Sequence, residues 1–467
     1  MEHNRFGYWI EEAGDVTSRP PLDEDLDVDL LIVGGGYTGM WTAWHAHRLD
    51  PEARIVILES EAVCGRGPSG RNGGFVEGMW TSLASMRGRW GDAQALAVAE
   101  SAQESALRVG AFCVDEGVDA WYRQAGYLEV STAPAQDGAG RAALEACREL
   151  GVPDRLRAVS VAEVQEHCAS AEFRAGVIEP IGATVQPARL ALGLRRRLLE
   201  EGVAIHESTK VSRFREAPDG VEATTTTGAR VRARRGVLAI GAAAKGHGGP
   251  LHGRLTVASS HVLITEPVPD VLEKIGWTRG EAITDGRALV HYFRATPDGR
   301  IVFGWGGGRI AMGARLHGRT EVDPDVIATQ RRHMLEYFPD LIDRRVTHAW
   351  GGPIDASPTH LPAVTSLPKS RAWVAAGYTG NGVGPTNMVG LTLASLALDR
   401  SDDPTRLAFV DAAMPRIPPE PFHWIGGESI RLGIAKKEDA EQEGRRPNPI
   451  ASAIAKVPKL IGFHIGR

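Results

Sequence analysis

The sequence predicts a mixed α/β fold, with a parallel sheet assembled from separated parts of the chain and an antiparallel sheet inserted between them. Two short apolar runs, 28–33 and 54–58, flank a glycine-rich turn and a helical stretch, as in a buried βαβ unit. The same order of strand, glycine-rich turn and helix returns at 372–398. Between these parts, 289–294 and 300–305 are predicted strands joined by a Pro-Asp-Gly turn, which is typical of antiparallel pairing.

A dinucleotide-binding motif lies in the first βαβ unit, so we expect its sheet to be Rossmann-like. The segment Gly34-Gly35-Gly36-Tyr37-Thr38-Gly39 follows the first strand and opens the helix, and Glu59 ends the second strand with Ser60 beside it. Gly34 allows the tight turn, Gly36 lets the backbone approach a pyrophosphate, and Gly39 lets the helix pack on the strand. The helix N-terminus offers N–H groups to the phosphates, and Glu59 is expected to bind ribose hydroxyls.

A second glycine-rich segment, 65–74, is too flexible and too polar for the interior of a helix or strand. Its arginines and unhindered N–H groups suit a second contact with an anionic cofactor, and a mobile surface loop is the alternative. The residues assigned to the cofactor here are Arg66, Gly67, Ser69, Arg71, Asn72, Gly73 and Gly74.

The rest of the chain alternates between helical and strand patterns. Apolar residues recur every three or four positions from Asp92 to Glu116, which predicts a long helix. Strands are predicted across 203–240, and the last of them delivers Gly241 to a turn. The predicted strand 372–377 flows into Gly377-Tyr378-Thr379-Gly380-Asn381-Gly382, which precedes another helix and its N-terminal N–H groups.

These elements divide the chain into seven predicted parts. They are a lead segment at 1–27, a cofactor-binding part at 28–90, a helical and substrate part at 91–184, a second cofactor-binding part at 185–250, an antiparallel substrate domain at 251–350, a third cofactor-binding part at 351–414 and a tail at 415–467. The tail ends in an amphipathic pattern that favours a helix packed on its own protein over a membrane anchor.

Composition and charge exclude several classes of protein. The 53 Lys and Arg against 58 Asp and Glu give a net charge of −5, which argues against a nucleic-acid partner. Cys64, Cys113, Cys147 and Cys168 form no close pair, so neither a disulfide scaffold nor a zinc site is expected. Without a signal-peptide pattern or an apolar run of roughly 18 residues, we expect a cytoplasmic protein with no membrane span.

The order of the glycine-rich segments resembles the FAD-dependent D-amino-acid oxidase (DAO) superfamily, whose cofactor domain is split between both ends of the chain. Within it, the closest resemblance is to the gamma-glutamylputrescine oxidase group, and it extends from about residue 6 into the tail. The motifs that carry it are SGRNGG at 69–74, FRATPDGR at 293–300, WGG at 350–352, GYTGNG at 377–382, and PPEP at 418–421 followed by Gly426-Gly427.

The resemblance implies a noncovalent, extended FAD. Its pyrophosphate would lie at 34–39, its adenosine ribose at Glu59, its adenine at the backbone of Val211, and its flavin along 66–74. The turn at 377–382 would place N–H groups at the pyrimidine edge of the ring, where reduction leaves negative charge. The remaining cofactor residues are Gly241, Gly377, Thr379, Gly380, Asn381 and Gly382. Cys64 follows Glu59 by five residues, which places it near the adenosine half, so attachment to the flavin ring is not expected.

The implied chemistry is oxidation of a C–N bond in a primary or secondary amine. The neutral amine gives a hydride to flavin N5, and the imine hydrolyses to an aldehyde and an amine. Because such a reaction depends mainly on orientation, no metal set is expected. His291, Tyr292, Trp350 and Tyr378 are the candidate catalytic residues, and His291 is the candidate proton acceptor because its ordinary pKa is near neutrality.

The candidate substrate contacts are Phe293, Arg294 and Trp305. Side chains alternate along a strand, so either His291 and Phe293 or Tyr292 and Arg294 face the cavity. A hydrogen-bonded structural histidine and structural tryptophans are the alternatives to these roles. Arg294 or Arg287 could pair with a substrate carboxylate, and each has a structural role as its alternative.

Other functions remain open at this stage. An amino-acid or N-methylglycine dehydrogenase of the same superfamily would be favoured by a carboxylate-binding arginine in the pocket. An NAD-dependent dehydrogenase fits residues 28–60 taken alone, but the other glycine-rich segments count against it. A flavin-fold protein of RNA modification would need a continuous basic groove, which the net charge of −5 does not support.

Overall fold

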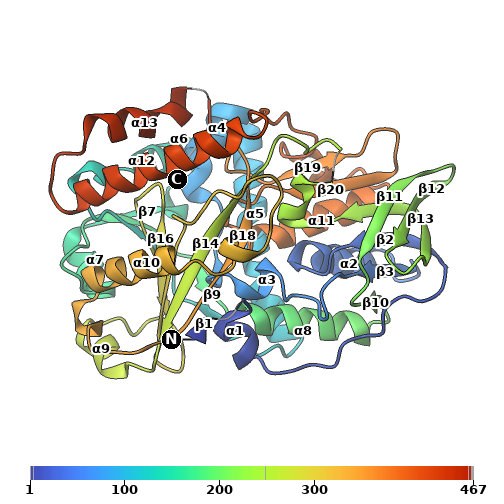
Figure 1. Cartoon of the computed structure of the whole chain (residues 1–467), viewed down its shortest axis with the longest axis horizontal. Coiled ribbons are helices and arrows are strands. Elements are labelled where there is room, and N and C mark those ends of the chain that lie inside the picture. Colours follow the sequence, from blue (N-terminus) through green and yellow to red (C-terminus); the bar gives the residue numbers. More distant parts are fainter. Residues whose placement is uncertain (1, 4, 248, 461, 464–467) are drawn as a thin grey trace.

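The computed structural model of the chain describes residues 2–3, 5–247, 249–460 and 462–463. Two large sheets form the frame of the molecule, and a small third sheet, of β4 (Phe75–Val76), β9 (Ala183–Thr184) and β5 (Arg123–Gln124), lies between them (Figure 1). The mixed α/β class predicted from the sequence is confirmed.

The first sheet collects strands from both ends and the middle of the chain. Five of its strands, in the order β10, β3, β2, β13 and β20, run parallel, and β12, β11 and β19 extend it in antiparallel fashion. The strands are β2 (Leu26–Val33), β3 (Ile55–Leu58), β10 (Ala204–His206), β11 (Val211–Ala217), β12 (Gly220–Thr225), β13 (Arg230–Leu238), β19 (Ala363–Ser366) and β20 (Ala372–Ala376).

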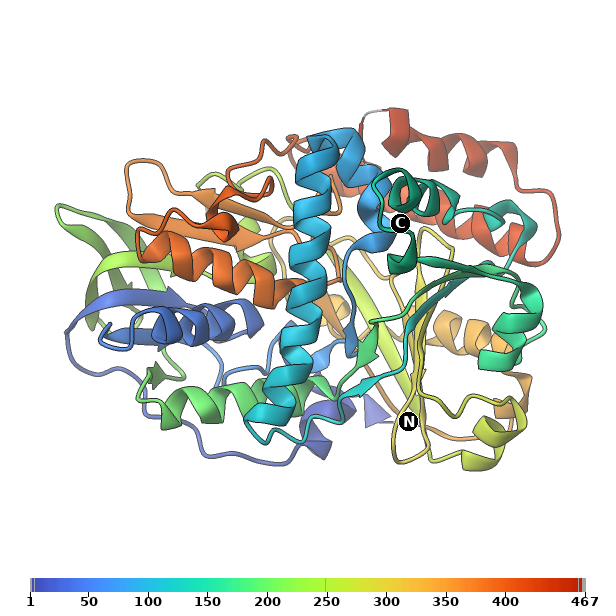
Figure 2. The same ribbon diagram turned by 180° about the vertical axis from the view of Figure 1, so that it is seen from behind.

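Helices cover one of the two apolar faces of this sheet. The main ones are α2 (Tyr37–Leu49), α5 (Asp92–Asp115), α8 (Pro187–Glu200) and α11 (Pro385–Ala397). A Cβ on Gly390 would come within 2.6 Å of the Cβ of Trp41, so α11 packs this closely on α2 because residue 390 is glycine. From behind, the long α5 runs across the molecule between its two halves (Figure 2).

The second sheet has nine strands, in the order β1, β18, β14, β17, β16, β15, β6, β8 and β7. Their bounds are β1 (Glu2–His3), β6 (Tyr127–Val130), β7 (Arg157–Val159), β8 (Gly176–Glu179), β14 (Thr256–Thr265), β15 (Ala282–Asp285), β16 (His291–Ala295), β17 (Ile301–Trp305) and β18 (Val346–Ala356). The helices α7 (Val161–His167), α9 (Pro269–Lys274) and α10 (Pro324–Tyr337) accompany its outer face. The predicted boundary at 350 falls inside β18, which continues to Ala356.

The tail forms two helices that pack on each other, α12 (Phe422–Gln442) and α13 (Pro449–Leu460), and they lie across the antiparallel half (Figure 1). The sequence pattern predicts only the second of them, because Gly426-Gly427 and many charges obscure the first. The remaining helices are α1 (Gly7–Glu12), α3 (Pro68–Arg71), α4 (Leu83–Trp90) and α6 (Arg141–Glu149).

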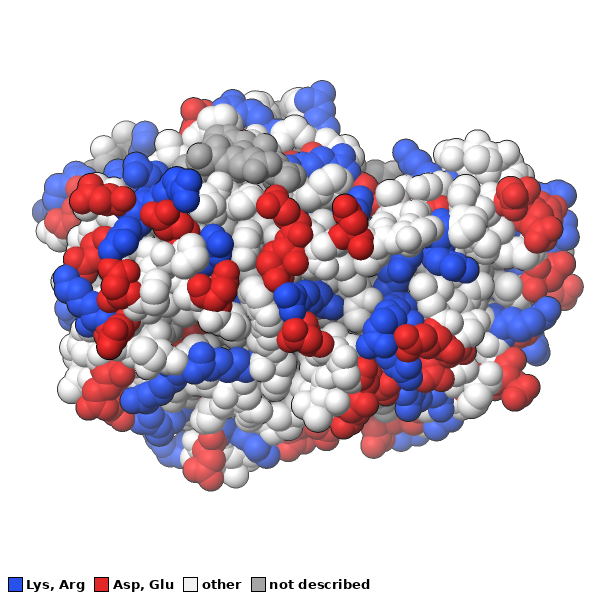
Figure 3. Space-filling model, turned by 90° about the horizontal axis from the view of Figure 1, so that it is seen from below, with Lys and Arg blue, Asp and Glu red and all other residues white. Residues whose placement is uncertain are grey.

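Surface charge is mixed on the face shown in Figure 3, where acidic and basic side chains alternate without a broad area of one sign. Among the described residues, no helix combines the length and apolar character needed to cross a membrane.

Candidate functional site

A cavity of about 470 Å³ lies where the glycine-rich segments meet the antiparallel sheet. Its lining combines three parts of the chain that the sequence analysis assigned to cofactor or substrate. They contribute Arg71, Asn72 and Gly73; Ser260, Thr284 and Tyr292; and Tyr378, Thr379, Gly380 and Asn381.

The first glycine-rich turn has the geometry of a phosphate-binding loop. Gly34 has φ +107°, and a Cβ there would come within 2.3 Å of the carbonyl oxygen of Ala239. A Cβ on Gly39 would come within 2.0 Å of the carbonyl oxygen of Gly34, so α2 starts this close to β2 because residue 39 is glycine. Gly36 is the N-cap residue of α2 and has no side chain to accept from the first N–H groups of the helix. The N–H of Tyr37 donates to Ser69 Oγ at 2.8 Å.

Glu59 lies at the end of β3 beside this turn. Its Oε2 accepts from the N–H of Gly35 at 2.6 Å, and its Oε1 accepts from the N–H of Glu61 at 2.7 Å and from Ser60 Oγ at 3.1 Å. Burial raises the pKa of this carboxyl group. A half-buried carboxylate at this position suits the ribose hydroxyls of a dinucleotide.

Cys64 belongs to the same end of the site. It is a buried free thiol, and a Cβ on Gly35 would come within 2.3 Å of its Sγ. Burial, with the charge of Glu59 as a smaller cause, raises the pKa of the thiol well above its usual range. The structure therefore places Cys64 at the first glycine turn and outside the cavity lining, which agrees with a flavin ring that is not attached to it.

The second glycine-rich segment is ordered by its own hydrogen bonds. Asn72 Nδ2 donates to the carbonyl groups of Pro68 and Ser69, and its Oδ1 accepts from the N–H of Gly74. The buried Arg71 donates to the carbonyl group of Arg5 at 2.9 Å. Arg66 lies outside the cavity lining, with its guanidinium over the ring of Phe6.

The third glycine-rich segment is held by Asp355, a residue that the sequence analysis did not single out. Its Oδ2 accepts from the N–H of Gly377 at 2.6 Å, its carbonyl group accepts from the N–H of Thr379, and burial raises its pKa to about 6. Tyr378 Oη lies 2.8 Å from Thr38 Oγ1 in a hydrogen bond that joins the third segment to the first.

Val211 and Gly241 lie where the sequence analysis expected them, at strand ends of the parallel sheet. Val211 begins β11 and is half-buried, and Gly241 follows β13 with φ +50°. Their contact with a cofactor stays a prediction.

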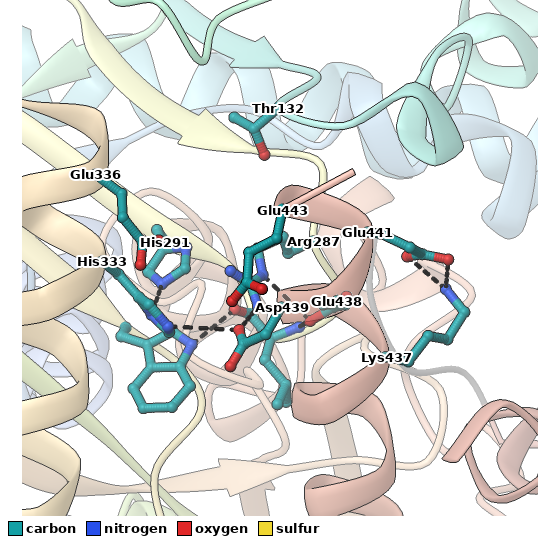
Figure 4. A network of polar contacts seen from close by, with 12 residues as sticks. Thr132, Arg287, His291, His333, Glu336, Lys437, Glu438, Asp439, Glu441 and Glu443 are labelled. Carbon is teal, nitrogen blue, oxygen red and sulfur yellow. Dashed lines mark hydrogen bonds and ion pairs between the residues drawn. The ribbon is translucent and has the colours of Figure 1, made fainter. Parts of the chain in front are cut away.

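The alternation along β16 turns Tyr292 toward the cavity, where its Oη shares a 2.7 Å hydrogen bond with Ser260 Oγ. His291 points the other way. Its Nδ1 lies 2.6 Å from Asp285 Oδ2 and its Nε2 lies 2.8 Å from His333 Nδ1, deep in the network of Figure 4. Burial lowers the pKa of His291 to about 4, and the side chain is fully buried. This placement corrects the expectation that His291 takes a proton from the substrate.

Four other predicted side chains also lie outside the cavity lining, and each has a structural partner. Phe293 stacks on Phe303 in the outer core, and Arg294 donates to the carbonyl groups of Gly74 and Val185. The indole N–H of Trp305 donates to Leu289, and that of Trp350 donates to Arg71, in each case to a carbonyl group. Of the candidate catalytic and substrate residues, Tyr292 and Tyr378 are those that the structure brings to the cavity.

Comparison with known proteins assigns the chain to a family. The model of the FAD dependent oxidoreductase family (DAO) matches residues 29–396. The chain belongs to this family. A probable oxidoreductase OrdL of Rhizobium meliloti (strain 1021) is 29% identical over 399 residues, which cover 82% of this chain and 86% of that protein.

Two further relatives of this FAD-dependent oxidoreductase cover most of its length. The gamma-glutamylputrescine oxidoreductase of Escherichia coli (strain K12) is 24% identical over 438 residues, 92% of this chain and 96% of that protein. The crystal structure of glycine oxidase from Geobacillus kaustophilus superimposes with a TM-score of 0.65 at 20% identity, covering 81% of this chain and 96% of that one. The NAD-dependent alternative is thereby set aside.

The residues present fit FAD, the cofactor of the family. A Cβ on Gly36 would meet only Ser69 Oγ, at 3.0 Å, so the backbone at the start of α2 is open to a phosphate. Gly380 and Gly382 have similarly open surroundings, because a Cβ added to either would have no atom closer than 3.8 Å. The residues that would hold the anionic pyrophosphate and the half-buried carboxylate of Glu59 would thus belong to separate parts of one extended site.

Several cavity residues, Glu77 and Thr284 among them, were not assigned to the site from the sequence, and Arg287 appears there in the structural role that was its stated alternative. Arg287 Nη2 donates to Asp439 Oδ1 at 2.5 Å, and its Nε lies 3.5 Å from Glu438 Oε2, so α12 holds it (Figure 4). No short motif marks these residues, because the chain segments that carry them meet only in the folded protein.

Proposed function

We propose that the protein oxidises the C–N bond of a primary or secondary amine to an imine, which water hydrolyses to an aldehyde and an amine. FAD, when bound, accepts the hydride from the carbon next to the nitrogen. The protein's own contribution is to bind and orient a neutral amine and to limit the access of water.

This proposal rests on one observation: the arginines that line the cavity are paired with carboxylates of the chain. Arg287 is paired with Glu438 and Asp439, and Arg71 Nη1 lies 3.4 Å from Glu321 Oε1. Each arginine that lines the cavity thus has a carboxylate partner within the described part of the chain. A substrate carboxylate would have to compete with these partners, whereas an amine does not.

The uncharged walls of the cavity suit the carbon chain of an amine. Phe75, Val262, Val290, Ile354 and Leu361 are among the lining side chains, and the aromatic rings of Tyr292 and Tyr378 face the same space. The similarity to gamma-glutamylputrescine oxidoreductase along nearly the whole chain supports an amine substrate.

Oxidation of an amino acid or of N-methylglycine is the second candidate, and the presence of Arg287 in the wall is the observation that favours it. It requires the guanidinium to leave Asp439, and α12 would then have to shift or rearrange.

An anaerobic reduction experiment separates the two candidates. The holoenzyme is mixed without oxygen with butylamine, with N-methylbutylamine or with N-methylglycine, and bleaching of the visible flavin band is followed. The proposal predicts bleaching by the amines, with butyraldehyde as a product, and little bleaching by N-methylglycine. Rapid bleaching by N-methylglycine alone would contradict it, and reduction by dithionite controls for a competent flavin.

A further inference from the structure

Three buried glutamates converge on one wall of the cavity. Glu77 follows β4 and lines the cavity, Glu129 lies within β6, and Glu179 ends β8. Their exposed fractions are 2%, 8% and 1%. Glutamate is rarely buried to this extent, because taking its charge out of water is costly.

The register of the strands directs these side chains to the cavity side of the sheet. Glu129 is the partner of Thr284 in the β6–β15 pair, and Thr284 lines the cavity. Glu179 is the partner of Tyr127, two residues before Glu129, and Tyr127 Oη lies 2.6 Å from Thr284 Oγ1. Because paired residues and residues two apart share one face of a sheet, Glu129 and Glu179 lie on the same face as Thr284.

Two carboxylate oxygens of Glu129 and Glu179 have no partner among the described residues. Glu179 Oε1 accepts from the N–H of Gly78 at 2.6 Å, but the Oε2 atoms of Glu129 and Glu179 have no hydrogen-bond partner. Among the described residues, no cationic group is close enough to count among the causes that set the pKa of either glutamate. The arginines of the cavity are already paired with other carboxylates, as described above.

Glu77 lies close enough to the other two carboxyl groups for its charge to act on each of them. Burial, reinforced by the charge of Glu77, raises the pKa of Glu129 to about 7 and that of Glu179 to about 8. A bound cation would reverse this shift and release the protons. Within the described residues, no set of acidic, histidine or cysteine side chains is arranged to hold a metal ion, so an organic cation is the fitting partner.

We infer that Glu77, Glu129 and Glu179 form a subsite for a second ammonium group of the substrate, distinct from the nitrogen that is oxidised. Carboxylates stabilise the protonated form of a nearby amine. The amine that gives up a hydride must be neutral, so the nitrogen that lies next to the three glutamates cannot be the one that is oxidised. The substrate class is therefore an alkyl diamine or a longer amine with a second cationic group. This inference rests on the proposed amine oxidation.

The test compares tetramethylenediamine with butylamine, which has the same carbon chain and one ammonium group fewer. We expect kcat/KM of the holoenzyme to favour the diamine by about 10-fold or more, as for a charge-assisted hydrogen bond in a buried site. Glu77→Gln should remove most of that preference, chiefly through KM, and Glu77→Asp should retain part of it. Glu100→Gln, which removes an exposed glutamate of α5, is the matched control and should keep the preference.

A binding measurement does not depend on turnover. Tetramethylenediamine is titrated calorimetrically into dithionite-reduced holoenzyme at about pH 7, in two buffers of different ionisation enthalpy. The inference predicts proton release on binding, because the cation lowers the pKa of Glu129 and Glu179. Glu129→Gln should reduce that release, and it replaces Glu77→Gln if the latter fails to fold.

The outcomes separate the two claims. Equal kcat/KM for both amines in the wild type, or an unchanged preference in folded Glu77→Gln and Glu129→Gln, would overturn the subsite while leaving amine oxidation in place. If no amine reduces the flavin but dithionite does, the proposed function fails. Binding without proton release would then overturn the glutamate subsite as well.

Discussion

The glycine-rich turn at the start of α2 offers two substitutions that separate cofactor binding from folding. Gly36 has φ −81° and ψ −177°, which any residue adopts, and its added Cβ would meet only Ser69 Oγ at 3.0 Å. Gly39 differs, because its added Cβ would lie 2.0 Å from the backbone oxygen of Gly34. Gly36→Ala should therefore fit the apoprotein, whereas Gly39→Ala should push α2 away from β2.

The magnitudes follow from these contacts. In Gly36→Ala the methyl group occupies the place predicted for the pyrophosphate, and loss of one charge-assisted hydrogen bond costs about 1.5–3 kcal/mol, or roughly 10- to 150-fold in the Kd of FAD. The free energy of unfolding of the apoprotein should change by less than about 0.5 kcal/mol. In Gly39→Ala that free energy should fall by about 1–3 kcal/mol from overpacking.

The assay is a titration of the apoprotein with FAD, followed by flavin fluorescence, beside urea unfolding of the same apoprotein. Gly88→Ala, in open space on α4, is the control: it should leave the Kd of FAD unchanged and raise the free energy of unfolding by about 0.5–1 kcal/mol, as expected for Gly→Ala within a helix. Wild-type affinity for FAD in Gly36→Ala would refute the placement of the pyrophosphate. Equal losses of stability in the apoproteins of Gly36→Ala and Gly39→Ala would refute the packing argument.

Three further predictions address other parts of the molecule. Tyr378→Phe and Thr38→Val should each weaken FAD binding. The double variant should bind FAD no more weakly than the weaker-binding single variant, because the two hydroxyls share one hydrogen bond of about 0.5–1.5 kcal/mol. Additive losses in a double-mutant cycle of FAD affinities would contradict this. His291→Gln should lower the melting temperature but leave the shape of the pH profile of kcat unchanged, since His291 lies outside the cavity lining; a displaced kinetic pKa would return it to the reaction. Burial lowers the pKa of His261 from 6.5 to about 4, so its neutral form stabilises the fold above pH 6.5 and this stability is lost as the pH falls toward 4. At about pH 5 this loss is about 2 kcal/mol. In urea unfolding, the free energy of unfolding of His261→Leu should therefore fall less between neutral pH and about pH 5 than that of the wild type. An equal fall in both proteins would contradict the lowered pKa of His261.

Much of the fold could be predicted because the strand, glycine turn and helix pattern is local. The bounds of β2 and α2, and the long helix α5, follow from apolar spacing and from glycines whose added Cβ atoms would collide with backbone. The helix α12 was missed because its apolar stripe is interrupted by glycines and charges, and its place is set by contacts of Glu438 and Asp439 with Arg287.

The side chains of the cavity were harder to predict than the glycine turns. The alternation of side chains along β16 does not show which of its two faces lines the cavity. In the structure His291 is buried against α10, so the opposite face, with Tyr292, lines it. A histidine near neutrality in solution becomes hard to protonate once it is buried, and the sequence does not display burial. Glu129 and Glu179 lie far apart in the chain and meet through strand register, and Glu77 approaches them from the residue after β4.

We infer that three glycine-rich segments of the chain enclose a noncovalent FAD. The measurement that tests it most directly is the visible absorption spectrum of the purified protein before and after acid precipitation. We predict a yellow protein that takes up about one FAD per chain and releases all of it into the supernatant. Flavin that stays with the pellet would contradict noncovalent binding. A colourless protein that takes up no added FAD would contradict FAD binding by these segments.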